Sequence, residues 1–262
     1  MSKKITSRQN KKIKALRKAR NNKGKLKDYL IVEGFNLADE VLRTDLEIKA
    51  CFYAEDLAES KLNKYLEAST ESFVLPADLF SYVAATLNPQ GILLVVEKPE
   101  FGDLSTLEAK LKEQIDKASI LVLESIQDPG NVGTMIRTAY ALDYDACILT
   151  GSSADPFKEK ALRSSTGAAL HLPTYQVESS ETVLKWLKYN KIVILSMAMQ
   201  GDNIKEYNLQ GSFSLWIGNE GHGLKASTIA NSDKVLSIPM PGGAESLNAA
   251  IAAAIAMYEL KR

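Results

Sequence analysis

The sequence predicts an α/β protein of two domains, and three observations lead to this prediction. Short apolar runs that suit buried strands alternate with segments whose apolar residues recur at helical spacing. The segment 98–103, KPEFGD, contains Pro and Gly and interrupts both periods, which predicts a domain boundary. With 262 residues, 45% of them hydrophobic, the chain has room for two modest domains or one large one. We therefore expect a smaller first domain over 1–98 and a second over 104–262.

The first domain opens with a basic arm. Residues 1–27 hold twelve of the 32 Lys and Arg residues and no acidic residue, so the remaining 20 face all 32 Asp and Glu. A basic block beside an acidic body predicts a nucleic-acid contact, although a solvated tail is the alternative. Residues 5–20 are expected to form a basic helix with a thin apolar stripe. The predicted RNA contacts are Lys3, Lys4, Arg8, Lys11, Lys12, Arg17 and Arg20.

The rest of this domain is predicted to alternate between strands and helices. Strands are expected at 30–34, 48–53, 73–75 and 92–97, and helices at 35–43, 61–68 and 77–85.

The second domain has a clearer rhythm, beginning with an amphipathic helix at 104–117. Its expected strands are 120–124, 146–150, 192–197, 214–217 and 235–238, and its other helices are 132–142, 157–163, 181–189, 225–230 and 247–260. The strands are continuous apolar runs, which predicts a parallel sheet covered on both faces.

Three strand ends are followed by polar, glycine-rich loops, which is where open α/β sheets bind ligands. The first loop, QDPGNVGTMIRTA (127–139), makes a tight turn, and Asn131 is expected to cap the helix that follows. Arg137 is expected within the first two turns of that helix, near its positive end. Because a cation is unfavourable there, this placement indicates an anionic partner such as a phosphate, with a simply exposed Arg as the alternative.

The second and third loops carry further candidates. The second, LWIGNEGHGL (215–224), has three glycines within six residues, which lets the backbone approach a ligand, and Glu220 lies in its middle. The third, IPMPGGAESLN (238–248), precedes an alanine-rich helix for which Ser246 is the expected cap. A solvated acid at Glu220, and capping alone at Ser246 and Asn248, are the alternatives.

Several classes of site and segment are excluded by what the sequence lacks. It contains no dinucleotide fingerprint, no phosphate loop ending in Gly-Lys-Ser/Thr and no nucleophile elbow. Its two Cys and two His are scattered, so no metal site is expected. We see neither a signal peptide nor an apolar run of the roughly 18 residues that suggest a membrane span, and expect a cytoplasmic protein.

At the three loops, the sequence resembles the SpoU/TrmH branch of the SPOUT RNA methyltransferases. The motifs that carry the resemblance are DPGNVGTMIRTA (128–139), IGNEGHGL (217–224) and IPMPGGAESLNAAIAAAI (238–255), in the right order and spacing. The first domain resembles, more weakly, the L30e-like RNA-binding domain often fused ahead of this catalytic domain, through SRQNKKIKALRK (7–18), YLIVEG (29–34) and NPQGILLVV (88–96). The resemblance implies a SPOUT domain with a deep trefoil knot, S-adenosyl-L-methionine (AdoMet) as methyl donor, no metal, and a homodimer that completes the site across its interface.

The resemblance also implies which residues act. The catalytic and RNA-contact positions map to Asn131, Arg137, Glu220, Ser246 and Asn248. The AdoMet-binding positions map to Gly218, Ile238 and Leu247, with Leu195, Ser196, Met240 and Ala249 as neighbours. In the implied reaction the ribose 2′-oxygen attacks the methyl carbon of the sulfonium, and S-adenosylhomocysteine leaves. Family accounts often make the arginine the base, but a guanidinium is a poor base because its pKa is very high. The other open alternative is that Arg137 clamps the adjacent phosphate and lowers the pKa of the hydroxyl while another group takes the proton.

The implied activity is AdoMet-dependent methylation of a ribose 2′-hydroxyl in RNA. We expect 23S ribosomal RNA as the substrate, because transfer-RNA members often lack the fused N-terminal domain. A tRNA 2′-O-methyltransferase and a ribosomal-RNA methyltransferase that confers antibiotic resistance are the alternatives within the family. An RNA-binding protein without catalysis, or another nucleotide-binding α/β enzyme, would show little or no AdoMet binding in calorimetry.

Overall fold

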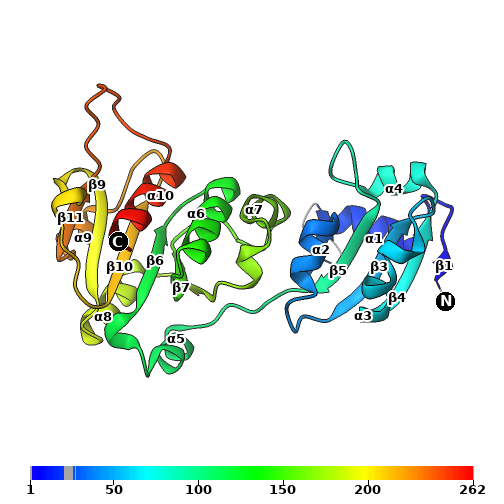
Figure 1. Ribbon diagram of the computed structural model, residues 1–262, viewed down its shortest axis with the longest axis horizontal. Coiled ribbons are helices and arrows are strands. Elements are labelled where there is room, and N and C mark those ends of the chain that lie inside the picture. Colours follow the sequence, from blue (N-terminus) through cyan, green and yellow to red (C-terminus); the bar gives the residue numbers. More distant parts are fainter. Residues whose placement is uncertain (1, 21–25, 27, 262) are drawn as a thin grey trace. The chain divides into compact units, whose positions relative to one another are not determined.

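The computed structural model describes residues 2–20, 26 and 28–261 and divides into two compact units. The first unit comprises residues 1–99 together with 157–170, and the second comprises 100–156 and 171–262. Each unit contains one sheet with its own helices, which confirms the predicted α/β class (Figure 1).

The first unit is built on a mixed five-stranded sheet. Its strands, in spatial order, are β1 (Lys3–Lys4), β4 (Ser69–Leu75), β3 (Ile48–Ala54), β5 (Ile92–Glu97) and β2 (Tyr29–Glu33). Its helices are α1 (Lys11–Arg20), α2 (Phe35–Val41), the short η1 (Glu59–Lys61), α3 (Asn63–Ala68) and α4 (Ala77–Val83), joined by α7 (Glu159–Ser165) and η3 (Ala168–Leu170). Strand β5 pairs antiparallel with both β2 and β3, and its side chains on one face, Leu93 and Val95, are buried in a core that includes residues of α1 and α4.

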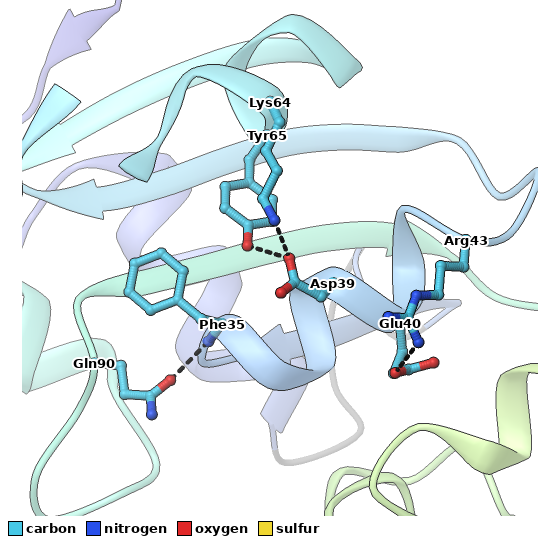
Figure 2. Close-up of polar contacts among 7 residues, drawn as sticks. All are labelled: Phe35, Asp39, Glu40, Arg43, Lys64, Tyr65 and Gln90. Atoms are coloured by element: carbon cyan, nitrogen blue, oxygen red, sulfur yellow. Dashed lines mark hydrogen bonds and ion pairs between the residues drawn. The ribbon is translucent and has the colours of Figure 1, made fainter. Parts of the chain in front are cut away.

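Helix α2 is held by side chains from other segments (Figure 2). It has no capping side chain of its own, and the Gln90 Oε1 atom accepts a hydrogen bond from the Phe35 backbone N–H at 2.7 Å. Asp39 accepts hydrogen bonds from Lys64 Nζ at 2.6 Å and from the Tyr65 hydroxyl. These contacts tie α2 to the segment before β5 and to α3.

The second unit is a six-stranded sheet in which every pair is parallel, as predicted from the continuous apolar runs. Its strands, in spatial order, are β11 (Lys234–Ser237), β9 (Val193–Asn203), β10 (Phe213–Gly218), β6 (Ser119–Glu124), β7 (Ala146–Thr150) and β8 (Thr174–Val177). Its helices are α5 (Leu104–Leu111), η2 (Ile115–Lys117), α6 (Pro129–Ala141), α8 (Ser180–Tyr189), η4 (Ile204–Glu206), α9 (Ala226–Ala230) and α10 (Ala249–Leu260). Buried leucines of α5 and α8 pack on one face of the sheet, whereas α6 and α10 pack against each other over the other face.

Several element bounds differ from the sequence expectation, and three of the differences have a clear physical reason. The helix expected over 5–20 begins only at Lys11, because Lys3–Lys4 pairs with β4 and Asn10 Oδ1 accepts a hydrogen bond from the Lys12 N–H at 2.9 Å. Strand β8 is missed because its four residues, TYQV, form no apolar run at the edge of the sheet. Strand β9 continues to Asn203 through polar residues, which pair with β11 in an irregular register.

The parallel sheet places the three candidate loops together at its carboxyl edge, where the C-terminal ends of the strands lie. Strands β6, β10 and β11 end at Glu124, Gly218 and Ser237, and the loops leave from these ends. Since the carboxyl ends of parallel strands lie at the same edge, loops far apart in sequence come together there.

Candidate active site

The loop after β10 is a closed turn with Glu220 at its tip. Asn219 and Gly223 exchange backbone hydrogen bonds of 3.0 and 2.8 Å across the turn. A Cβ on Gly218 would lie 2.2 Å from the backbone of Gly223, so only glycine permits this closure. Asn219 Oδ1 accepts hydrogen bonds from two backbone N–H groups inside the turn, and Asn219 Nδ2 donates to the Ser125 carbonyl at 2.8 Å. The turn is thereby tied to the loop after β6.

The Glu220 carboxylate faces the loop after β6. Its Oε1 accepts a hydrogen bond from Asn131 Nδ2 at 2.9 Å, and the Gln127 and Asp128 backbone N–H groups make longer contacts of 3.4 and 3.3 Å. Partial burial raises the pKa of Glu220, but the hydrogen bonds from Asn131 and from backbone N–H groups outweigh it and hold the pKa below its ordinary value. Glu220 is therefore an ionised acceptor at neutral pH.

Asn248 brings the third loop into the same network. Its Nδ2 donates to Asn131 Oδ1 at 3.2 Å, and its Oδ1 accepts from the Ala250 and Ile251 N–H groups at the start of α10, at 2.9 and 3.3 Å. The amide orientations follow from chemistry, because a carboxylate only accepts hydrogen bonds and Asn131 must turn its NH₂ toward Glu220. The Asn131 oxygen then faces the NH₂ of Asn248. The structure thus joins Glu220, Asn131 and Asn248, one residue from each loop.

Glu124, a residue that the sequence analysis did not single out, supports this arrangement from the end of β6. Glu124, the last residue of β6, is 1% exposed. Its carboxylate accepts hydrogen bonds of 2.9 Å from the Lys225 N–H and from the Thr228 hydroxyl, which fixes α9 just after the Glu220 turn. The only signal in the sequence is a carboxylate that ends an apolar run directly before a polar loop.

Arg137 lies apart from the network, and its expected position is wrong. Helix α6 begins at Pro129, so Arg137 lies in its third turn, beyond the reach of the positive end. The helix is capped by Asp128, whose side chain accepts from the Gly130 N–H at 2.8 Å, and not by Asn131. The Arg137 side chain is exposed and forms no hydrogen bond or ion pair with another described residue. Its guanidinium is free to meet a ligand.

The sequence predicted that Ser246 would cap α10, and this prediction is wrong. Asn248 is the cap, and Ser246 is exposed without a hydrogen bond to any described residue. The two serve different purposes because the helix begins at Ala249, which puts Asn248, and not Ser246, next to the free N–H groups.

The candidate AdoMet positions divide into two groups. Gly218 ends β10 at the carboxyl edge, and Ala249 is the first residue of α10. Between them in the chain, the third loop carries three partly exposed apolar residues, Ile238, Met240 and Leu247. In contrast, Leu195 and Ser196 are fully buried within β9, where the Ser196 and Ser232 hydroxyls hydrogen-bond at 2.6 Å. The side chains of this second group are committed to the core.

The chain matches two family models. Residues 118–258 match the SpoU rRNA Methylase family, and residues 10–94 match the MRM3-like substrate binding domain. The chain belongs to the SpoU rRNA methylase family. A relative from Bacillus subtilis strain 168, named 23S rRNA (guanosine(2553)-2′-O)-methyltransferase RlmP, is 34% identical over 99% of both chains.

Two solved methyltransferase structures resemble the chain over nearly its whole length. The SpoU methyltransferase AviRb from Streptomyces viridochromogenes, in complex with AdoMet, is 26% identical with a TM-score of 0.82, covering 97% of this chain and 98% of its own. A structure titled RNA 2′-O ribose methyltransferase is 25% identical with a TM-score of 0.79, covering 98% of both chains. These findings confirm the predicted family and activity: this SpoU protein is an AdoMet-dependent RNA 2′-O-ribose methyltransferase that acts on ribosomal RNA.

The predicted RNA contacts of this SpoU protein occupy several different environments. Lys3 and Lys12 pair with Glu71, and Lys4 pairs with Glu55 at 2.8 Å. The guanidinium groups of Arg8 and Arg17 lie 4.5 and 4.4 Å from the centroid of the Tyr82 ring. Lys11 is exposed without an ion pair to a described residue, and the side chain of Arg20 lies outside the described residues.

No metal cluster or membrane-spanning helix is found in the part of the chain that the structure describes. Its His, Cys, Asp and Glu side chains form no group of three or more that could hold a metal ion. Its helices are all too short or too polar to cross a bilayer.

Proposed function

We propose that this SpoU protein methylates the ribose 2′-hydroxyl of a guanosine in 23S ribosomal RNA, in the cytoplasm. The observation that carries the proposal is the full-length similarity to RlmP, whose name specifies that reaction, combined with an intact Glu220–Asn131–Asn248 network. The presence of the substrate-binding domain also favours a ribosomal substrate over transfer RNA.

The residues at the carboxyl edge fit AdoMet. Ile238, Met240 and Leu247 offer partly exposed apolar surface in the third loop. The tightly closed Gly218 turn lies at the same carboxyl edge of the sheet, and its backbone groups can face a ligand without side chains between. Apolar surface with a few backbone donors and acceptors suits an adenine ring. When bound, AdoMet supplies the electrophilic methyl group. Leu195 and Ser196 would contribute through the backbone of β9, because their side chains are buried.

Arg137 is assigned the role of a phosphate clamp. The exposed guanidinium has no described acid beside it, and the group is a cation that offers five N–H donors and no acceptor. A fork of N–H donors pairs well with the phosphate next to the reacting ribose, and its positive charge stabilises the alkoxide that develops on the 2′-oxygen. Glu220 and Asn248 act as positioning residues for the loop that carries Asn131.

We also propose that the active form is a homodimer with the outer side of α10 in the interface. This helix is apolar almost all round, with Glu259 as its one charged residue, and Ile251 and Tyr258 are exposed by 51% and 61%. A helix that is apolar all round is normally buried, so its outer side needs a cover. A second copy supplies the same surface by two-fold symmetry. Light scattering coupled to size exclusion should give a mass near twice 28.7 kDa.

The substrate proposal is tested by offering labelled AdoMet with equal amounts of unmodified 23S RNA, 16S RNA and transfer RNA transcripts. We expect label in 23S RNA, and digestion to nucleosides should release it as 2′-O-methylguanosine. Label confined to transfer RNA, or released as another nucleoside, would overturn the proposal.

A further inference from the structure

Helix α1 has three kinds of face, set by helical geometry. Ile13 and Leu16 are fully buried and fix the inner face against the domain core. At 3.6 residues per turn, Lys11, Lys14 and Lys18 fall together on the opposite side. All three are exposed. We call these three residues the lysine ridge.

The basic residues beside the buried face are engaged within the domain. Lys12 lies over the Phe73 ring, 4.5 Å from its centroid, and pairs with Glu71. On the other flank, Arg17 stacks over Tyr82 and donates a hydrogen bond to its hydroxyl. Side chains that cover aromatic rings in this way stabilise the packing of α1, and part of their charge is already balanced.

The ridge differs from these flanks in having no protein partner. Among the described residues, no carboxylate forms an ion pair with Lys11, Lys14 or Lys18, and no ring lies under them. Three unpaired cations within eight residues of helix span about 10 Å from end to end, and neighbours are about 5–6 Å apart at their Cβ atoms. Such a row suits successive phosphates of one RNA strand, which lysine contacts as a flexible point charge.

We propose that the lysine ridge binds the phosphate backbone of the substrate RNA and supplies most of the salt-dependent affinity of α1. The inference rests on the proposed function, since it names the surface by which the RNA is held. It also differs from the sequence expectation, because Lys14 and Lys18 were not among the predicted contacts, whereas Lys3, Lys4 and Lys12 were. The ridge contacts phosphates and not bases, so it orients the RNA without determining which nucleotide is methylated.

The test compares two triple variants that lose the same charge. The ridge variant is Lys11→Gln, Lys14→Gln and Lys18→Gln. The control variant is Lys110→Gln, Lys112→Gln and Lys117→Gln, which changes three exposed lysines of the second unit that form no ion pair with a described residue.

Affinity for a fluorescein-labelled 20-nucleotide oligouridylate is measured by anisotropy from about 50 to 500 mM salt. Three lost phosphate contacts should flatten the slope of log K against log salt by about 2, so that wild type loses about 100-fold more affinity over this range than the ridge variant. The control variant should keep the wild-type slope. AdoMet affinity and thermal midpoints, unchanged in both variants, would establish that each is folded.

Methyl transfer to 23S RNA is measured alongside, so that the two proposals can fail separately. If wild type methylates 23S RNA but both variants share one salt slope, the ridge is wrong and the proposed function stands. If the ridge variant alone has a flattened slope while wild type methylates no RNA, the ridge stands and the proposed function is wrong.

Discussion

Replacing Glu220 by Ala removes the acceptor on which the three-loop network depends. Asn131 Nδ2 then loses its 2.9 Å partner, and the Gln127 and Asp128 N–H groups lose contacts of 3.4 and 3.3 Å. A hydrogen bond to a charged group contributes about 1.5–3 kcal/mol, and exposure with two long contacts favours the lower end. About 1.5 kcal/mol corresponds to roughly tenfold, and we expect that loss in the single-turnover rate of methyl transfer to 23S RNA at saturating AdoMet.

Two comparisons make this prediction sharp. Glu245→Ala removes an exposed acid from the third loop that forms no hydrogen bond or ion pair with a described residue, and it should leave the rate within twofold of wild type. The double variant Asn131→Ala/Glu220→Ala should be little worse than either single variant, because both changes break the same hydrogen bond. Equal rates for Glu220→Ala and Glu245→Ala, or fully additive losses in the double variant, would refute the positioning role of Glu220.

Protonation of Glu220 should have the same effect as its removal. Because its folded-state pKa is lowered, its contribution is complete above the ordinary carboxyl value of about 4.3 and is lost as the pH falls through the lowered value. Between about pH 6 and 8, the pH profiles of wild type and Glu220→Gln should therefore have the same shape. A profile that titrates in this range in wild type alone would contradict the assignment.

Three further substitutions test the scaffold and the clamp. Gly218→Ala should weaken AdoMet binding in calorimetry by at least about 100-fold, because its Cβ would meet the Gly223 backbone at 2.2 Å, whereas Gly221→Ala, with its nearest atom at 3.6 Å, should bind within a few-fold. Glu124→Gln should cost about 2 kcal/mol, because an amide donor replaces one buried acceptor, and lower the melting midpoint by roughly 4–8 °C in circular dichroism. Arg137→Ala should slow methyl transfer by about 100-fold or more with an unchanged melting midpoint, and Arg137→Lys should recover part of the rate if the clamp is correct.

Much of the sheet follows directly from the sequence, since buried parallel strands are written as continuous apolar runs. The strand at 146–150 is an example, because all five residues of ACILT are buried as its composition requires. The edge strand β8 could not be predicted in this way, because only two of the four residues in TYQV are buried and the segment is not a continuous apolar run. The knotted path of the last segment stays a prediction of the family resemblance.

The sequence predicted the three loops that form the site but not the hydrogen bonds that join them. Glu220 and Asn131 are 89 positions apart, and Asn131 and Asn248 are 117 apart, so only the order of strands in the sheet brings them into contact. The capping residues were wrong for a local reason. The first loop contains Asp128 and Asn131 and the third contains Ser246 and Asn248, and the sequence does not fix which residue of each pair directly precedes the first helical turn.

The most direct test of the central claim is to locate the methyl group that the enzyme transfers. Ribosomal 23S RNA methylated with labelled AdoMet is hydrolysed in alkali, which cleaves every linkage whose 2′-hydroxyl is free. The proposed chemistry predicts that the label is recovered in an alkali-resistant dinucleotide with guanosine on its 5′ side. Label recovered in mononucleotides would mean methylation of a base and would contradict the assignment of a ribose 2′-O-methyltransferase.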